Sequence, residues 1–434
     1  MSQNVLISVI TIIFYITSML GGNTTSEISQ KKSLTPNPVS SSDLPSVAGQ
    51  SGEILSDRVT VRSGPSTEYS AITSITNAET VTILSTDNGW YEVRLSNGQT
   101  GWIAGYLVNI IPFSPRLDNV KGKTIIGYYM LGRQSYNSLI QNSSSITSVV
   151  PWSWGIDSYG GLTNDFNAQN LAEVLQFAGH QQLESLALVH NFFNGSFDAQ
   201  IVSSFLNNPY AQNRAIDNIH QTLGEWGMSG INLDFENVPA KDREALTSFV
   251  ARLAERLRAD NFTVTMAVPA KTTDNPTSNF SGAFDYRALS QHADQLILMA
   301  YDQHWRNGSP GPVASVEWVE QVIQYAVSQA PANKIVLGIP NYGYDWPQSG
   351  PATSMTYPQT MELAAKQGVS VRWHSTHKVP FFHHGNDRQV WFENRYSIKY
   401  KLDLVNKYDL GGVALWRLGQ EDPGIWRVID DTIN

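Results

Sequence analysis

The chain has 434 residues, enough for two or three domains, because a domain usually holds about 100 to 200 residues and a barrel more. Its net charge is −9, with 29 Lys and Arg against 38 Asp and Glu and no basic run, which argues against a nucleic-acid partner. Cysteine is absent, which excludes disulfides, a thiolate nucleophile and a Cys-ligated metal site.

The first segment is typical of an exported protein. Val5–Leu20, VLISVITIIFYITSML, is uncharged and mostly apolar, and two glycines follow it. We interpret 1–22 as a signal peptide or an N-terminal anchor; no Lys or Arg precedes the run, which is shorter than the roughly 20 residues that span a bilayer. Any membrane contact would be made by this segment. Residues 23–52, rich in Ser, Thr, Pro and Gln, are expected to form a flexible linker.

Residues 53–112 have the pattern of a small all-β barrel, with short alternating segments between Gly, Asn and Pro turns. The Asn-Gly pair in Ser96–Gln99 favours a tight hairpin turn. VTVRSGPS (59–66), GWYEVRL (89–95) and GQTGWIAGYLV (98–108) resemble the bacterial SH3-like modules of cell-wall proteins. The resemblance implies a module that targets an enzyme to peptidoglycan. A packing module without a ligand is the alternative.

Strands alternate with amphipathic helices in residues 121–434, which predicts a parallel sheet wrapped by helices. Apolar residues recur at helical spacing in 243–260 and 316–330. The eight strand candidates are Thr124–Met130, Ser144–Trp154, Glu184–Phe192, Gly230–Glu236, Phe262–Pro269, Gln295–Asp302, Lys334–Gly343 and Gly411–Gly419. Eight such strands predict an α/β fold, a (β/α)8 TIM barrel. The long gap after the seventh strand predicts a small α+β insertion at about 345–395, near the C-terminus, which could wall one side of a groove.

Polar and apolar side chains alternate in GINLDFENVP, Gly230–Pro239. Successive strand residues point to opposite faces, so the polar side chains share one face and the apolar ones the other. We expect the apolar face to pack on helices and the polar face, with Asn232, Asp234 and Glu236, to line the lumen. Glu236 would then lie nearest the C-terminal mouth, where barrel active sites form.

Asp234 and Glu236 stand two strand positions apart, roughly 6 to 7 Å between Cα atoms. At that spacing each charge raises the pKa of the other carboxyl, so one can stay protonated near neutral pH as a general acid. Glycoside hydrolysis uses an acid for the leaving oxygen and a second group that stabilises developing positive charge. The residues alone therefore predict a barrel hydrolase with a carboxylate pair.

The same strand carries a family resemblance. GMSGINLDFEN resembles the glycoside hydrolase family 18 signature D-G-x-D-x-D-x-E: Gly230, Asp234 and Glu236 match, whereas Ser229 and Asn232 stand where Asp is usual. Further segments similar to the family fall on expected strands, and the similarity covers 121–434; these segments are GYY (127–129), MAYD (299–302) and ALWRLG (414–419). The NLDFENV variant looks like the branch of bacterial wall and spore-associated enzymes that cleave N-acetylglucosamine linkages.

The resemblance implies a retaining, substrate-assisted mechanism that needs no cofactor. Glu236 would protonate the glycosidic oxygen, and Asp234 would orient the 2-acetamido group of the sugar. Tyr301 would donate a hydrogen bond to the acetamido oxygen, and Trp416 would form the floor under the sugar. Other pocket residues that it implies are Tyr128, Met299 and Asp302.

Three polar residues complete the expected site. The Asn232 amide is expected to donate a hydrogen bond to Asp234, with the pH profile altered by the missing charge. Asn191, at the end of the third strand, could reach into the pocket, and Gln303 after the sixth strand could touch sugar. No metal site is expected, because the histidines of the insertion match no helical zinc spacing and no Cys accompanies them; these are His374, His377, His383 and His384.

These observations predict a secreted glycosidase, associated with the cell wall or spore and monomeric. Its substrate would be an N-acetylglucosamine-containing polysaccharide cleaved at β-1,4 linkages, with peptidoglycan or spore cortex preferred. A chitinase or chito-oligosaccharide hydrolase is the alternative among enzymes. A non-catalytic glycan-binding wall protein is the alternative outside them, and the presence of Glu236 favours an enzyme.

Overall fold

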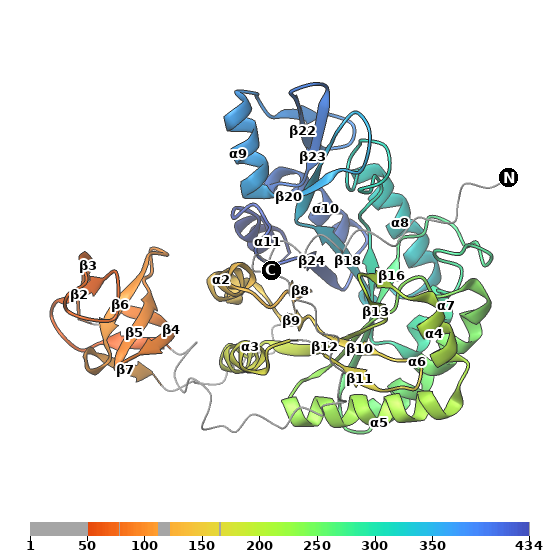
Figure 1. The fold of residues 1–434 in the computed structure, drawn as a ribbon, viewed down its shortest axis with the longest axis horizontal. Helices are drawn as coiled ribbons and strands as arrows, with labels where there is room; N and C mark the ends of the chain where they lie inside the picture. Colours follow the sequence, from red (N-terminus) through yellow and green to blue (C-terminus); the bar gives the residue numbers. More distant parts are fainter. Residues whose placement is uncertain (1–50, 78, 112–121, 165, 434) are drawn as a thin grey trace, which may run out of the picture.

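The computed structural model describes residues 51–77, 79–111, 122–164 and 166–433 (Figure 1). The predicted signal peptide or anchor and nearly all of the predicted linker lie outside these residues. Within the described part of the chain, no helix combines the length and the apolar character needed to cross a membrane.

A small all-β unit forms the N-terminal part of the described chain. Its seven strands pair in the order β3-β2-β6-β5-β4-β1-β7 around a core that includes Val61, Ile83 and Val93. The strands are β1 Ser51–Ile54, β2 Val59–Arg62, β3 Ala71–Ile75, β4 Thr80–Asp87, β5 Trp90–Arg94, β6 Thr100–Ala104 and β7 Val108–Ile111, with a 3-10 turn at Gly105–Leu107 before β7. The predicted hairpin turn joins β5 to β6, and Gly98 has φ of 83° there.

The small unit touches the larger one through β5. The Arg94 guanidinium donates a hydrogen bond from Nη1 to the Ile140 carbonyl of α2 (Arg133–Asn142) at 2.7 Å. Partial burial of Arg94 lowers the pKa of its guanidinium.

The larger unit is a closed barrel of eight parallel strands, as predicted. The strands pair in chain order from β12 to β24, then through β8 to β9, and β9 closes the barrel against β12 at Ser148 and Glu184. The strands are β8 Thr124–Tyr129, β9 Ser148–Pro151, β12 Glu184–His190, β15 Gly230–Asp234, β16 Thr263–Pro269, β17 Gln295–Met299, β18 Ile335–Pro340 and β24 Gly412–Trp416.

Helices surround the barrel on its outer side (Figure 1). Besides α2 they are α3 Ala168–His180, α4 Ala199–Leu206, α5 Pro209–Trp226, α6 Arg243–Arg258, α7 Tyr286–His292, α8 Val316–Gln329, α10 Arg395–Lys407 and α11 Ile425–Ile433. The helices expected within 243–260 and 316–330 are confirmed as α6 and α8. Short elements at the strand ends are β10 Trp154–Ile156, β11 Leu162–Thr163, β13 Phe192–Phe193 and β14 Ser196–Phe197, and 3-10 turns cover Ser143–Ser145, Ala240–Asp242 and Ala332–Lys334.

Two predicted strands are each divided in the structure. The second splits into a 3-10 turn, β9 and β10, and the seventh splits into β18 and β19 (Tyr342–Trp346). In both cases the barrel strand ends at a proline, Pro151 or Pro340. Proline has no N–H to donate to the neighbouring strand, so the ladder stops there and the chain changes direction.

β19 starts a five-stranded antiparallel sheet, which stands with α9 (Tyr357–Gln367) above the barrel in Figure 1. The other strands of this sheet are β20 Thr353–Thr356, β21 Arg372–His374, β22 Val379–His384 and β23 Arg388–Phe392, in the order β20-β19-β23-β22-β21. The buried carboxylate of Asp345 fixes the sheet, because it accepts hydrogen bonds from Arg388 at 2.7 Å and from His384 at 3.1 Å. We call this α+β unit the insertion.

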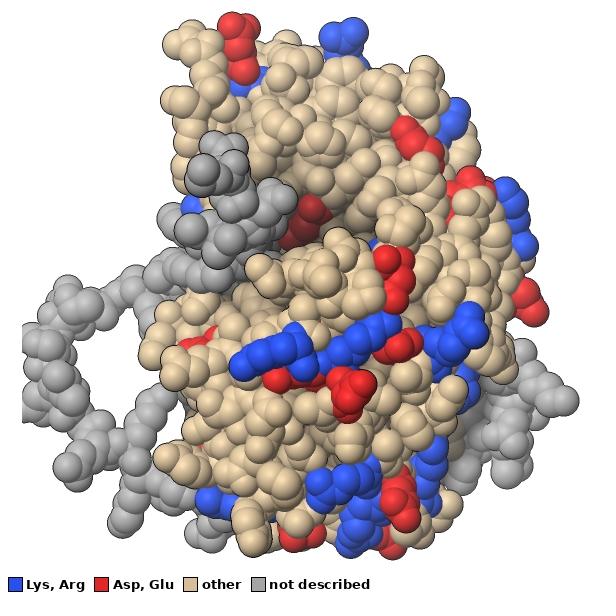
Figure 2. All heavy atoms as spheres, turned by 90° about the vertical axis from the view of Figure 1, so that its right-hand side faces the viewer, with Lys and Arg blue, Asp and Glu red and all other residues tan. Residues whose placement is uncertain are grey.

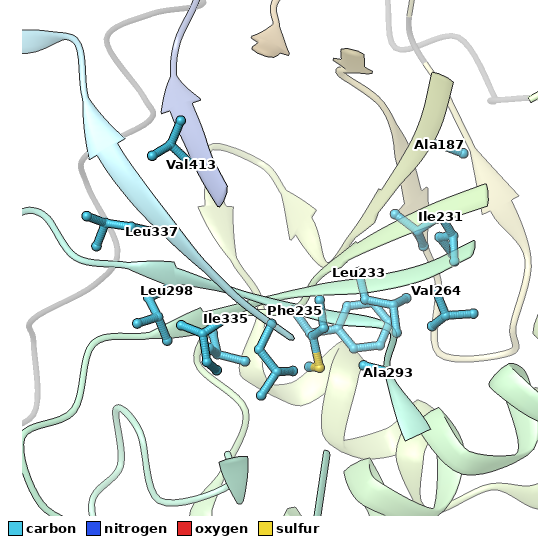
Figure 3. Close-up of a cluster of buried hydrophobic side chains, with 14 of the residues drawn as sticks. Ala187, Ile231, Leu233, Phe235, Val264, Ala293, Leu298, Ile335, Leu337 and Val413 are labelled. Carbon is cyan, nitrogen blue, oxygen red and sulfur yellow. The ribbon is translucent and has the colours of Figure 1, made fainter. Parts of the chain in front are cut away.

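The alternation of β15 places its apolar face outward, as predicted. Ile231, Leu233 and Phe235 lie in a buried cluster beneath the helices, together with residues of the neighbouring strands (Figure 3). Gly230 starts the strand at a close approach to β16, since a Cβ there would lie 2.2 Å from the Thr263 carbonyl oxygen. The opposite face of β15 therefore points into the lumen.

Candidate active site

A pocket of about 380 Å³ opens at the C-terminal ends of the barrel strands. Figure 2 shows this face of the molecule, with a hollow below the insertion and acidic side chains in its depth. The residues that line the pocket are Tyr128, Phe197, Asp234, Glu236, Ala267, Pro269, Ala270, Phe280, Met299, Tyr301, Asp302, Gln303, Trp305, Trp318, Tyr342 and Trp416. Three carboxyl groups and a wall of aromatic rings therefore share one cavity.

The carboxyl groups of Asp234 and Glu236 both reach this pocket, as the alternation in Gly230–Pro239 predicts. Asp234 is 5% exposed, and burial raises its pKa. Burial also raises the pKa of Glu236, and the charges of Asp234 and Asp302 raise it further. The two carboxyls thus have different surroundings, an arrangement in which one carboxyl can act as an acid and the other as an anion.

Asp302 contributes the third carboxyl group, from the turn after β17, where its φ is 57°. The phenol hydroxyls of Tyr342 and Tyr344 donate hydrogen bonds to Asp302 Oδ1 at 2.6 and 3.0 Å. Burial raises the pKa of Asp302 to about 6, although both hydrogen bonds oppose that rise. The insertion therefore controls the charge of a pocket residue, because both tyrosines belong to β19.

Tyr344→Phe is expected to raise the pKa of Asp302 further, because one of the two stabilising hydrogen bonds is lost. Asp302 would then be less charged near neutral pH and would oppose the ionisation of Glu236 less. The basic limb of the pH profile of kcat/KM should therefore move to lower pH by roughly one unit or less. Tyr344 is fully buried and does not line the pocket, so substrate contacts stay intact. Tyr325→Phe on α8 is the control, and an unchanged basic limb in Tyr344→Phe contradicts the prediction.

Asn232 does not make the hydrogen bond that was expected. Its Nδ2 donates to Thr265 Oγ1 at 2.8 Å, and its Oδ1 accepts from the Tyr128 hydroxyl at 3.0 Å. Among the described residues, no hydrogen bond joins Asn232 to Asp234. Asn232 is 0% exposed and lies beneath the pocket and not on its wall. The expectation was wrong because Thr265, directly opposite Asn232 on β16, offers a nearer acceptor inside the lumen.

Asn191 also differs from its expectation, since it does not line the pocket. It is 0% exposed, and its amide is bonded to the backbones of Glu236 and Asp198. The chain turns sharply after β12 into the β13–β14 hairpin, and this turn directs the side chain of Asn191 between two backbones.

The other expected residues line the pocket. Trp416 and Tyr128 meet edge to face with ring centroids 5.3 Å apart, which forms an aromatic floor. Burial raises the pKa of the Tyr301 phenol well above its usual range, so this hydroxyl remains a donor at all ordinary pH values. Met299 ends β17, and Gln303 lies in the loop that follows it. Gln303 Oε1 accepts a hydrogen bond from the Ser315 N–H at 2.9 Å.

The sequence interpretation missed several pocket residues. Tyr342 is one of them. It alternates in YGYDW with Tyr344, which lies outside the lining, and this spacing could have indicated that the two rings share one face. Further examples are Phe197 of β14, Phe280 of a loop and Trp318 at the start of α8, whose approach to the pocket has no local sequence signal.

The histidines of the insertion have protein partners. His377 Nδ1 bonds to the Glu317 carboxylate, the His374 and His377 rings stack with centroids 4.0 Å apart, and His384 contacts Asp345. Within the described ranges, no group of three or more His, Asp or Glu has the arrangement of a metal site.

Comparison with known proteins gives two family matches. The family described as glycosyl hydrolases family 18 matches residues 124–421, and the bacterial SH3 domain family matches residues 57–109. A cortical fragment-lytic enzyme of Bacillus anthracis is 32% identical over 267 residues, which are 59% of this chain and 62% of that enzyme. The chain thus spans less than two thirds of that relative's length.

Solved structures show the same similarity. The spore cortex-lytic enzyme SleL of Bacillus megaterium QM B1551 superimposes with a TM-score of 0.67 and 28% identity, over 76% of this chain and 77% of that one. A chitinase of Chromobacterium violaceum ATCC 12472 has a TM-score of 0.67 and 31% identity, over 71% of this chain and 98% of that one.

Proposed function

Because the chain belongs to glycosyl hydrolase family 18 and is a glycosidase, we propose that it cleaves β-1,4 linkages of N-acetylglucosamine-containing glycan in spore cortex or peptidoglycan. The observation that carries the proposal is the carboxyl pair at the end of β15, in which Asp234 and Glu236 both line an aromatic pocket and burial raises the pKa of each. The similarity to cortex-lytic enzymes supports the choice of glycan.

The geometry supports a retaining mechanism in which the sugar supplies its own nucleophile. The Glu236 carboxyl gives its proton to the glycosidic oxygen while the acetamido oxygen attacks the anomeric carbon, so one C–O bond forms as another breaks. Asp234 stabilises the positive charge that develops on the acetamido group, and Tyr301 donates a hydrogen bond to the acetamido oxygen. A water then attacks the anomeric carbon while the bond from that carbon to the acetamido oxygen breaks, and the water gives a proton back to Glu236, which restores the enzyme.

The charge of the pocket supports N-acetylglucosamine as the sugar at the cleavage point. Among the described lining residues there are three carboxyl groups and no Lys or Arg. A sugar that bears a free carboxylate would meet repulsion there without a compensating cation. An uncharged N-acetylglucosamine suits the site better, and cleavage should leave it at the new reducing end.

The purified full chain is therefore expected to release N-acetylglucosamine reducing ends from cortex fragments or peptidoglycan with retained β configuration. Mass spectrometry of borohydride-reduced products identifies the sugar at each new end, and early NMR spectra give the anomer. New ends that carry muramic acid, or an inverted α-anomer, would contradict the proposal.

Chitin is the second candidate substrate, supported by the structural similarity to a chitinase. Parallel digestion of chitin and cortex fragments decides between them, because faster release of ends from chitin would move the assignment to chito-oligosaccharides. Glycan binding without turnover on either polymer would favour a non-catalytic wall protein.

We also propose a location for the enzyme. The match to the bacterial SH3 family supports a wall-targeting role for the N-terminal β unit, and the apolar segment Val5–Leu20 supports export. The similarity to a cortical fragment-lytic enzyme supports an association with the spore or the cell wall. The protein is proposed to act there as a monomer.

A further inference from the structure

The catalytic strand ends before the acid that it carries. β15 pairs with β12 as far as the His190 and Asp234 positions, and with β16 as far as Leu233 and Met266. Glu236 therefore lies beyond the last ladder pair on both sides of its strand. Without another restraint, its backbone would have no neighbour-strand hydrogen bond to fix it.

Asn191 supplies that restraint with its side chain. Glu236 N–H donates to Asn191 Oδ1 at 2.9 Å, and Asn191 Nδ2 donates to the Glu236 carbonyl at 2.9 Å. One buried side-chain amide thus bonds both the backbone N–H and the backbone carbonyl of Glu236, in place of hydrogen bonds to a neighbouring strand. An amide is suited to this because it carries an acceptor and two donors in one plane.

The same amide connects Glu236 to the β13–β14 hairpin. Asn191 Nδ2 also donates to the Asp198 carbonyl at 3.0 Å, and Asp198 N–H donates to the Asn191 carbonyl at 2.9 Å. Asn237, which follows the acid with φ of 55°, donates from Nδ2 to the Phe197 carbonyl at 3.1 Å. The hairpin therefore holds both Glu236 and the residue after it, and its own Phe197 lines the pocket.

We propose that Asn191 is a positioning residue for proton transfer, which fixes the Glu236 backbone so that the carboxyl meets the leaving oxygen. This inference rests on the proposed role of Glu236 as the acid. Asn191 acts through Glu236, because it is fully buried and does not reach the pocket. Misplacement of the acid would slow cleavage in proportion to how much protonation the leaving group needs.

Leaving-group dependence gives the test. In an N-acetylglucosamine oligosaccharide the leaving group is a sugar alkoxide, which must be protonated by the acid. In the corresponding 2,4-dinitrophenyl β-glycoside the leaving group is a stable phenolate, which hardly needs protonation. For Asn191→Asp and Asn191→Ala, kcat/KM is measured on both substrates, since this constant reports on the step that breaks the bond. We expect the loss on the oligosaccharide to exceed the loss on the aryl glycoside by at least about tenfold.

The ratio separates positioning from folding. A smaller fraction of folded enzyme lowers both rates equally and cancels in the ratio of the two substrates. Gln212→Leu is the matched control: Gln212 is also a buried amide, which donates to the Leu206 carbonyl at 2.6 Å on the outside of the barrel. It should lower the melting temperature without changing the ratio.

Asn191→Asp adds a second signature. Its carboxylate can still accept from the Glu236 N–H but cannot donate to the two carbonyls, so part of the oligosaccharide activity should return at low pH, where a protonated carboxyl can donate. Equal losses on both substrates in an active enzyme would overturn the role of Asn191. A wild-type protein that cleaves neither substrate nor any glycan would instead overturn the proposed function, and this inference with it.

Discussion

Glu236→Gln is expected to lower kcat for glycan cleavage by about 10²- to 10⁴-fold, the range by which a general acid accelerates such reactions. Gln has nearly the shape of Glu but no proton that it can transfer to the leaving oxygen. The raised pKa of Glu236 is the physical basis, because burial and two neighbouring carboxyl groups favour the protonated form that an acid needs.

Binding should survive the same change. The glutamine side chain of Glu236→Gln would fill the same volume beside the aromatic floor, so calorimetry with an uncleaved oligosaccharide should give a Kd close to that of the wild type. Glu244→Gln, at an exposed position in the first turn of α6, is the control and should leave kcat unchanged. Turnover by Glu236→Gln within tenfold of the wild type would contradict its assignment as the acid.

Asp234→Asn is expected to slow catalysis and to stabilise the fold at alkaline pH. If Asp234 stabilises the acetamido group as proposed, loss of its negative charge should reduce kcat by about 10²- to 10³-fold, as removal of one preorganised electrostatic partner usually does. The neutral amide also removes the cost of a buried charge, so the free energy of unfolding should rise where the wild-type carboxyl is ionised.

The pH dependence of this stabilisation has a definite sign. Burial raises the pKa of Asp234 to about 7 in the folded protein, against about 4 in an unfolded chain. The contribution of Asp234 to stability is therefore complete below about pH 4 and is lost as the pH rises through about 7. Asp234→Asn should match the wild type near pH 4 and exceed it near pH 8 by at most about 4 kcal/mol.

Denaturant unfolding at the two pH values measures the difference. Asp431→Asn, at an exposed position on α11, should show no such pH-dependent gain. An Asp234→Asn protein that is less stable than the wild type near pH 8 would mean that the carboxylate has stabilising partners in the pocket.

The barrel and its strand β15 could be predicted from the sequence, because the sequence patterns that indicate them are local. Alternation along Gly230–Glu236 predicts which side chains face the lumen. Eight repeats of strand and helix are compatible with few folds other than a parallel barrel. The small β unit was predictable for the same reason, since its turns carry their own Gly and Asn signals.

The errors arise where two distant segments compete for one side chain. The sequence shows that Asn232 precedes Asp234 by two positions, but not that Thr265 of the next strand takes its amide. Asn191 was expected to reach into the pocket, but the reversal after β12 turns it toward the backbone of Glu236. Hydrogen-bond partners of buried amides depend on tertiary packing, which alternation along one strand does not determine.

The hydrogen bonds under the pocket have a direction. The Tyr128 hydroxyl donates to Asn232, the Asn232 amide donates to Thr265, and the Thr265 hydroxyl donates to the Ile231 carbonyl at 3.0 Å. The last bond returns to β15, and its acceptor is a peptide oxygen.

A peptide oxygen cannot take up a proton and pass it on, and an amide in the middle of the series does not shuttle protons as a carboxyl would. The series is therefore a dead end for proton conduction through the barrel floor. In the proposed mechanism Glu236 exchanges its proton with the sugar and with the attacking water, on the pocket side of this series. A bound glycan that fills the mouth would separate both carboxyls from bulk solvent. The proton that Glu236 gives to the leaving group would then be replaced, within the same catalytic cycle, by a proton from the attacking water.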